Sequence, residues 1–139
     1  MSQPGTKRIA ILFTCSDWRL HQRGVRFPEQ VQEQYGVETD LVVLPGPDGV
    51  AVSPERLRDA GAVLDWARLL IGAHRPAMLI AAPHYNCAGH PVDDAEHDEG
   101  SKRLAEWLKS ETGFEGKVVA GCAVRKTDDD WSFKEVAVI

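Results

Sequence analysis

Two short motifs, the first with a cysteine and the second with a histidine and a cysteine, each follow a run of apolar residues. The first motif is Cys15-Ser16-Asp17-Trp18-Arg19, after the run 9–14, and the second is His84-Tyr85-Asn86-Cys87, after the run 77–82. Apolar runs without polar alternation are typical of parallel strands that are covered on both faces. Open α/β sheets bind ligands just beyond the carboxyl ends of their strands, so we expect the two motifs to meet at one edge of a sheet.

The two motifs together provide two thiolates and one imidazole, from Cys15, Cys87 and His84, and this is a ligand set that suits Zn²⁺. The long gap between Cys15 and His84 argues against a small zinc finger, whose ligands come in two short pairs. A tetrahedral ion with three protein ligands has one position left for water. The sequence therefore predicts one Zn²⁺ per chain, at a site of chemistry rather than a purely structural one.

The charged residues of the first motif lie close to its cysteine. In an extended segment alternate side chains share one side, so we expect Asp17 and Arg19 to face the same way as Cys15, and Trp18 to face away. Asp17 could then orient zinc-bound water or occupy the fourth metal position, while Arg19 keeps the carboxylate ionised. A structural ion pair is the alternative. We predict catalytic or gating roles for both residues, because they flank a ligand.

The hydrophobic pattern predicts strands that alternate with helices over the whole chain. We expect strands at 8–14, 39–44, 77–82, 117–124 and 132–138, the last two joined by a polar turn at 127–130, and helices at 28–35, 53–74 and 101–110. In the helix at 53–74, the hydroxyl of Ser53 is expected to cap the start. The buried stripe of this helix is expected to be Leu57, Ala60, Leu64, Ala67 and Ile71. This order indicates a single α/β domain over residues 1–139, with a mostly parallel central sheet flanked by helices.

Composition restricts the partners of the chain. The 139 residues are 43% hydrophobic, with a formal net charge of -5, which opposes nonspecific nucleic-acid binding. No run is long enough to span a membrane, and residues 1–8 lack the apolar core of a secretory signal. We therefore expect a cytoplasmic protein that acts on a small-molecule substrate. The third cysteine, Cys122, lies in an apolar strand and is expected to be a core residue.

A second group of polar residues, His90, Asp94 and His97, has the spacing of one helix face. These residues could form a second metal site, or one of the histidines could relay protons, since histidine titrates near neutral pH. The interpretation we favour is a polar surface segment over the acidic stretch 93–99. A phosphatase-like Cys15 nucleophile is disfavoured, because Asp17 would repel a phosphate.

The two motifs resemble the signature of the β-class carbonic anhydrases, which is Cys-x-Asp-x-Arg after one strand and His-x-x-Cys after another. The segments 40–44, 53–74 and 117–139 are also similar to the family's second strand, following helix and closing strand pair. The resemblance implies zinc bound by both cysteines and the histidine, an Asp-Arg pair that orients the metal-bound water or releases the aspartate to the metal, and a homodimer or tetramer. The implied reaction is the reversible hydration of carbon dioxide to bicarbonate by metal-bound hydroxide.

The sequence also departs from this signature. The family usually has Arg-Asn-Ala-Gly-Asn where this chain has Leu-Pro-Gly-Pro-Asp-Gly at 44–49, a glycine in place of Pro83, and a Cys-Gly pair in place of Cys87-Ala88. Two other functions therefore stay open. The site could hydrolyse a related small electrophile such as carbonyl sulfide or carbon disulfide, or the protein could be a noncatalytic zinc protein in which Asp17 closes the metal permanently.

Overall fold

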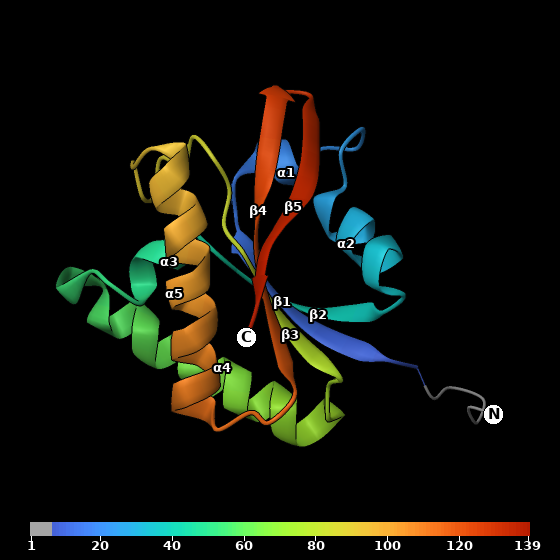
Figure 1. Ribbon diagram of the computed structural model, residues 1–139, viewed down its shortest axis with the longest axis vertical. Helices are drawn as coiled ribbons and strands as arrows, with labels where there is room; N and C mark the ends of the chain where they lie inside the picture. Colours follow the sequence, from blue (N-terminus) through green and yellow to red (C-terminus); the bar gives the residue numbers. More distant parts are fainter. Residues whose placement is uncertain (1–6) are drawn as a thin grey trace.

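A five-stranded sheet with helices on both faces forms the framework of the protein (Figure 1). The computed structural model describes residues 7–139. Two predictions extend outside this range: the single domain over residues 1–139, and the lack of a secretory signal at residues 1–8. The strands are β1 (Ile9–Cys15), β2 (Glu38–Leu44), β3 (Met78–Ala82), β4 (Lys117–Thr127) and β5 (Asp130–Val138). The helices are α1 (Trp18–His21), α2 (Phe27–Tyr35), α3 (Pro47–Val50), α4 (Leu57–His74) and α5 (Asp94–Thr112), with a 3₁₀ turn at Pro54–Arg56.

The sheet has the strand order β2-β1-β3-β4-β5. All neighbouring strands are parallel except β4 and β5, which form an antiparallel hairpin. The predicted α/β fold with a mostly parallel sheet is therefore confirmed. Within the described part of the chain, no helix combines the length and the apolar character that crossing a membrane requires.

The two faces of the sheet are covered by different helices. On one face α2 packs Phe27 and Val31 against the sheet, and on the other face α4 and α5 pack Ala67 and Leu108. The central strands β1 and β3 are buried along almost their whole length. This double coverage explains why the sequence of these strands is apolar without alternation.

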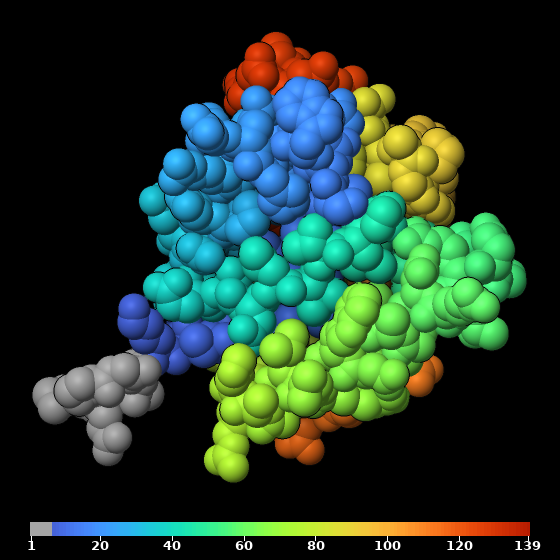
Figure 2. Space-filling view, turned by 180° about the vertical axis from the view of Figure 1, so that it is seen from behind, coloured from blue at the N-terminus to red at the C-terminus, as the bar shows by residue number. Residues whose placement is uncertain are grey.

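The edge strand β2 and helix α4 lie side by side on the face that Figure 2 shows. Leu41 and Val43 of β2, together with Trp66 and Leu69 of α4, line a shallow groove there and are all more than a third exposed. Exposed apolar side chains of this kind mark surfaces that can be covered by another protein.

Several helices differ from the sequence-based expectation. Helix α3 forms at 47–50, where the sequence predicted no helix, and α5 begins at Asp94 rather than at residue 101. The side chain of Asp93 caps α5 by accepting a 2.8 Å hydrogen bond from the backbone N–H of Glu96. The acidic residues that suggested a surface segment are therefore the first turn of a helix, where negative charge is favourable.

Helix α4 also differs in its start and in its buried face. Ser53 makes no side-chain cap, because a 3₁₀ turn comes before the helix, and Leu57 in the first turn is 78% exposed. The fully buried positions are Val63 and Ala67, with Ile71 partly buried beside them. Ala60, Ala67 and Ile71 of the predicted stripe do face the core, but Leu57 lies beyond the contact with the sheet, and Val63 takes the place that was predicted for Leu64.

Candidate metal centre

The fold places both motifs at the carboxyl edge of the sheet. Cys15 is the last residue of β1, and Thr14 pairs with Ala82, the last residue of β3. The chain after β3 continues along β4, because the backbone N–H of Ala123 donates to the carbonyl of Pro83 at 2.8 Å. Proline at this position loses no bond to β4, since its carbonyl makes the contact. His84 is therefore held against the sheet directly beside Cys15.

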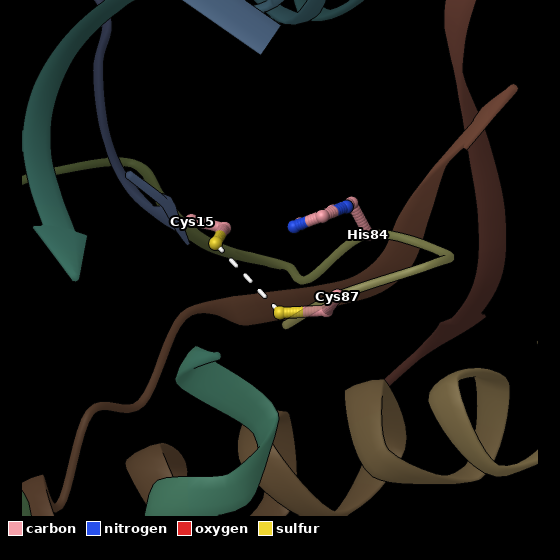
Figure 3. Close-up of side chains that lie close together, drawn as sticks. All are labelled: Cys15, His84 and Cys87. Atoms are coloured by element: carbon pink, nitrogen blue, oxygen red, sulfur yellow. Dashed lines mark hydrogen bonds between the residues drawn. The ribbon is translucent and has the colours of Figure 1, made fainter. Parts of the chain in front are cut away.

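Cys15, His84 and Cys87 converge at this edge (Figure 3). Their ligand atoms all lie within 4.8 Å of one another, and all three residues are buried. The two sulfur atoms are 3.9 Å apart. Two thiolates that share a tetrahedral zinc at about 2.3 Å each would lie about 3.8 Å apart, so the observed spacing fits this ion. Among the cysteine, histidine, aspartate and glutamate residues that the structure describes, these three form the one group close enough together to hold a metal ion.

The imidazole of His84 is oriented as a metal ligand requires. Its Nδ1 lies 2.7 Å from the carbonyl oxygen of Tyr85, to which an Nδ1–H donates, and this leaves Nε2 with its lone pair. Nε2 is buried and has no hydrogen-bond partner among residues 7–139. A buried polar atom without a partner requires an explanation, and a metal ion beside the two sulfurs provides one. The ring of Trp131 packs edge-on against the imidazole at a centroid distance of 5.5 Å.

The two thiols form a coupled pair. A hydrogen bond from Cys87 lowers the pKa of Cys15, and the same bond raises the pKa of Cys87. Burial raises the pKa of both thiols, and backbone amides beside each sulfur oppose this effect. The balance leaves the pKa of Cys15 at about 4 and that of Cys87 above its usual value, so Cys15 is the sulfur whose surroundings favour thiolate, the form that binds zinc.

Asp17 and Arg19 form a bidentate ion pair beside the ligands. Arg19 Nη2 lies 2.7 Å from Asp17 Oδ2, and Arg19 Nε lies 3.1 Å from Asp17 Oδ1. Burial tends to raise the pKa of Asp17, but hydrogen bonds from the side chain and backbone of Arg19 outweigh it, so this pKa lies below its usual value. Asp17 Oδ2 is 3.6 Å from His84 Nε2, which places the carboxylate at the margin of the ligand cluster.

The geometry that brings this pair together differs from the predicted one. The first motif does not stay extended after Cys15, because Asp17 accepts a 2.9 Å hydrogen bond from the backbone N–H of Arg19 and caps α1. Arg19 reaches Asp17 from the first turn of this helix and not through strand alternation. Trp18 is 67% exposed, but it lines the same pocket as Cys15 and Asp17 and so does not lie on the opposite side from them as predicted.

Three further residues hold Arg19, and sequence reasoning gave no role to any of them. Nη1 of Arg19 donates to Asn86 Oδ1 and to Asp128 Oδ1, both at 3.0 Å, and its guanidinium lies 5.1 Å from the centre of the Trp131 ring. Asn86 has a positive φ of 57°, which asparagine tolerates better than most residues. Its position inside the second motif was the available signal. Asp128 and Trp131 come from the β4–β5 hairpin, and no sequence spacing linked them to the site.

A pocket of about 640 Å³ opens onto the cluster. It is lined by residues of both motifs, among them Trp18 and Asn86, and by Pro45 and Gly89 from the neighbouring loops. A small molecule could therefore reach the three ligands and Asp17 from solvent.

The group His90, Asp94 and His97 does not form a second metal site among the described residues. The polar-surface interpretation is also wrong for His97, which is fully buried and bonded through Nδ1 to Asp48 Oδ2 at 2.7 Å. The reason is that α5 begins early and turns His97 inward against α3, whereas Asp94 is exposed. Cys122 is buried in β4 as expected.

Comparisons with known proteins agree with this arrangement. A family model described as "Putative carbonic anhydrase" matches residues 5–137. Among solved structures, the carbonic anhydrase from Streptococcus mutans superposes with a TM-score of 0.52 at 17% sequence identity, covering 94% of this chain and 81% of that chain. At this identity the similarity shows the fold alone. No curated protein matches the sequence.

Proposed function

The chain belongs to the family of putative carbonic anhydrases, and from this membership and the geometry of the site we propose that it is a zinc enzyme that hydrates carbon dioxide reversibly to bicarbonate. The observation that carries the proposal is the convergence of two thiols and an unpartnered imidazole nitrogen with an ionised aspartate at their margin.

Cys15, His84 and Cys87 would hold the zinc, since their number, softness and spacing suit the ion. Zinc bound by three protein ligands lowers the pKa of a coordinated water to about 7 and so supplies a hydroxide nucleophile near neutral pH. The hydrogen bond from His84 Nδ1 to the carbonyl of Tyr85 fixes the ring so that Nε2 faces the sulfurs.

Asp17 has the position of an orienting group. Its Oδ2 lies 3.6 Å from His84 Nε2, and its carboxylate can accept a hydrogen bond from the attacking group and direct its lone pair at the carbon. Arg19 keeps this carboxylate ionised and holds it through two parallel hydrogen bonds. Because Arg19 is also held by Asn86 and Asp128, the Asp17 carboxylate has a fixed partner away from the ligand cluster. This pairing favours an enzyme over a noncatalytic protein in which Asp17 closes the metal.

Substrate and partners follow from the same site. The pocket opens to solvent and suits a small uncharged substrate. We expect the homodimer or tetramer that the resemblance implies, and the groove between β2 and α4 is a surface that such an assembly could cover. Thiolate ligands are kept reduced in the cytoplasm, which is the compartment we expect.

Stopped-flow measurement of carbon dioxide hydration by the zinc-loaded protein tests the proposal. We expect turnover by the wild type from neutral to mildly alkaline pH, its loss in Cys87→Ser with loss of zinc, and a strong reduction in Asp17→Ala with zinc retained. A wild type that holds zinc and does not hydrate carbon dioxide would refute the proposed reaction.

A second candidate is the hydrolysis of carbonyl sulfide or carbon disulfide on the same site. Pro45 lines the pocket in a loop where related enzymes usually have polar groups, so this part of the entrance favours a less polar substrate. Turnover of a sulfur analogue without turnover of carbon dioxide would select this candidate. If zinc is bound and neither substrate reacts, the noncatalytic function is the one supported.

A further inference from the structure

Asp48 and His97 form a buried pair that the proposed reaction does not use. His97 Nδ1 and Asp48 Oδ2 are 2.7 Å apart, and both side chains are completely buried. The other two polar atoms of the pair, Asp48 Oδ1 and His97 Nε2, have no hydrogen-bond partner in the described part of the chain. Burying such groups is costly, and replacing them with apolar residues is often neutral or stabilising. A pair of this kind is therefore better explained by what it positions than by stability.

The pair ties the loop after β2 to helix α5. Asp48 belongs to the short helix α3, and His97 lies in α5, one turn before Gly100. A Cβ atom at Gly100 would lie 2.8 Å from Asp48 Oδ2, so the absence of a side chain there makes room for the carboxylate. The loop is also held from its other side, because Arg56 donates to the carbonyl of Gly46 at 2.6 Å.

The same loop packs against the segment that carries Cys87. A Cβ at Gly46 would lie 2.6 Å from the carbonyl carbon of Gly89, and a Cβ at Gly89 would lie 2.8 Å from the nitrogen of Gly46. A Cβ at Gly49 would meet the ring of His90 at 2.8 Å. The two backbones are therefore in direct contact, and fixing one of them fixes the other.

The loop after β2 is thereby tied to both motifs through the backbone. Gly89, which touches Gly46, lies two residues beyond Cys87, and the carbonyl of Leu44 accepts a 3.2 Å hydrogen bond from the N–H of Ser16, the residue after Cys15. Groups that hold metal ligands in place orient them and tune the metal, and their loss typically costs about 10- to 100-fold in metal affinity or activity.

We propose that Asp48 and His97 are positioning residues of the metal centre, which fix the loop at 45–50 on α5 and so hold in place the backbone segments that carry Cys15 and Cys87. This assigns a role to the loop that departs most from the family signature. The inference rests on the proposed zinc site and not on which substrate the zinc enzyme uses.

Zinc affinity of variants tests this inference, measured by competition with a chromogenic chelator. We expect Asp48→Ala to weaken zinc binding about tenfold or more. Asp48→Asn keeps an acceptor for His97 Nδ1–H and should stay within about threefold of the wild type. In the cobalt-substituted protein, Asp48→Ala should shift the sulfur-to-cobalt charge-transfer band, because the backbone that positions the two sulfurs is no longer fixed.

Leu108→Ala is the matched control. Leu108 is fully buried in α5, in the core on the sheet face opposite to α2, and its truncation destabilises the fold through a cavity. We expect this variant to bind zinc as the wild type does and to leave the charge-transfer band unchanged. If Leu108→Ala and Asp48→Ala weaken zinc binding in proportion to their loss of stability, or if neither moves the band, the pair is merely structural and the inference is wrong.

The inference and the proposed reaction fail on different results. Wild-type zinc affinity and an unmoved band in folded Asp48→Ala would overturn the inference and leave the proposed reaction intact. A selective loss of zinc affinity in Asp48→Ala, together with a wild type that hydrates neither carbon dioxide nor a sulfur analogue, would support the inference and refute the reaction.

Discussion

Replacing Gly46 with alanine should damage the protein more than the same change at Gly36, although both glycines have a left-handed backbone. Their φ angles are +52° and +62°. At Gly36 a Cβ would meet no atom of the described residues within 4 Å, whereas at Gly46 it would lie 2.6 Å from the carbonyl carbon and 2.7 Å from the carbonyl oxygen of Gly89. The difference between the two variants therefore isolates the contact between the two loops of the metal centre.

The magnitudes follow from these two geometries. A residue with a Cβ costs about 1–2 kcal/mol in the left-handed conformation, and the reduced freedom of the unfolded chain offsets part of this. Gly36→Ala should therefore cost about 1 kcal/mol. Gly46→Ala meets backbone atoms that cannot rotate away, so the loops must separate, and overpacking of this kind adds about 1–3 kcal/mol. We expect a total cost of about 2–4 kcal/mol for Gly46→Ala.

Urea unfolding of the metal-free proteins measures the two costs, and chelator competition then measures zinc affinity. Gly46→Ala should lower both the free energy of unfolding and the affinity for zinc, while Gly36→Ala should lower only the first. Equal destabilisation by the two changes, or unaltered zinc affinity in Gly46→Ala, would show that the contact between Gly46 and Gly89 does not support the metal centre.

Five further outcomes are expected. Asp17→Ala should reduce carbon dioxide hydration by about 10²-fold with zinc content unchanged. Arg19→Lys should reduce it by about tenfold, because lysine cannot form the bidentate pair with Asp17. Stopped-flow rates, together with metal analysis, measure both effects. Removal of zinc should lower the free energy of unfolding by about 2.7 kcal/mol relative to protein with free zinc at about 100 times its dissociation constant, a change that thermal melts would reveal. Burial raises the pKa of Asp98, but hydrogen bonds from Lys134 and Tyr85 outweigh it, so this pKa lies below its usual value. The stability that Asp98 contributes should therefore be present above its unfolded pKa of about 4 and disappear as the pH falls through the lower folded value. In urea unfolding, the free energies of Asp98→Asn and the wild type should converge in acid, and a difference that stays constant with pH would contradict this. Leu69→Asp in the exposed groove should weaken the expected dimer, which light scattering after size exclusion would detect as a lower mass.

The sequence alone predicts the fold and the ligand cluster for a common reason. Apolar runs before Cys15 and His84 identify two buried parallel strands, and parallel strands bring their carboxyl ends to one edge. The convergence of the two motifs then needs no knowledge of the loops between them. The donor types and the resemblance to the family signature supply the rest, which the family match over residues 5–137 supports.

The parts that the sequence does not predict depend on tertiary contacts. Asp48 lies in a segment rich in proline and glycine, which is typical of an exposed loop. Its carboxylate is buried instead, and the hydrogen bond to His97 in α5 offsets part of the cost of that burial. His97 lies in an acidic stretch whose residues cap and begin a helix, so its local composition conceals its burial. Asp128, which accepts a hydrogen bond from Arg19, lies in a hairpin more than a hundred residues further along the chain, and no spacing pattern links the two residues. Long-range contacts of single residues leave no periodic signal.

Metal stoichiometry tests the central claim most directly. Elemental analysis of the purified protein should find one zinc per chain in the wild type and little zinc in Cys15→Ser and Cys87→Ser, with the fold of each variant checked by circular dichroism. A folded wild type without stoichiometric zinc, even after zinc is supplied, or folded cysteine variants that retain it in full, would contradict the assignment of Cys15, His84 and Cys87 as the ligands.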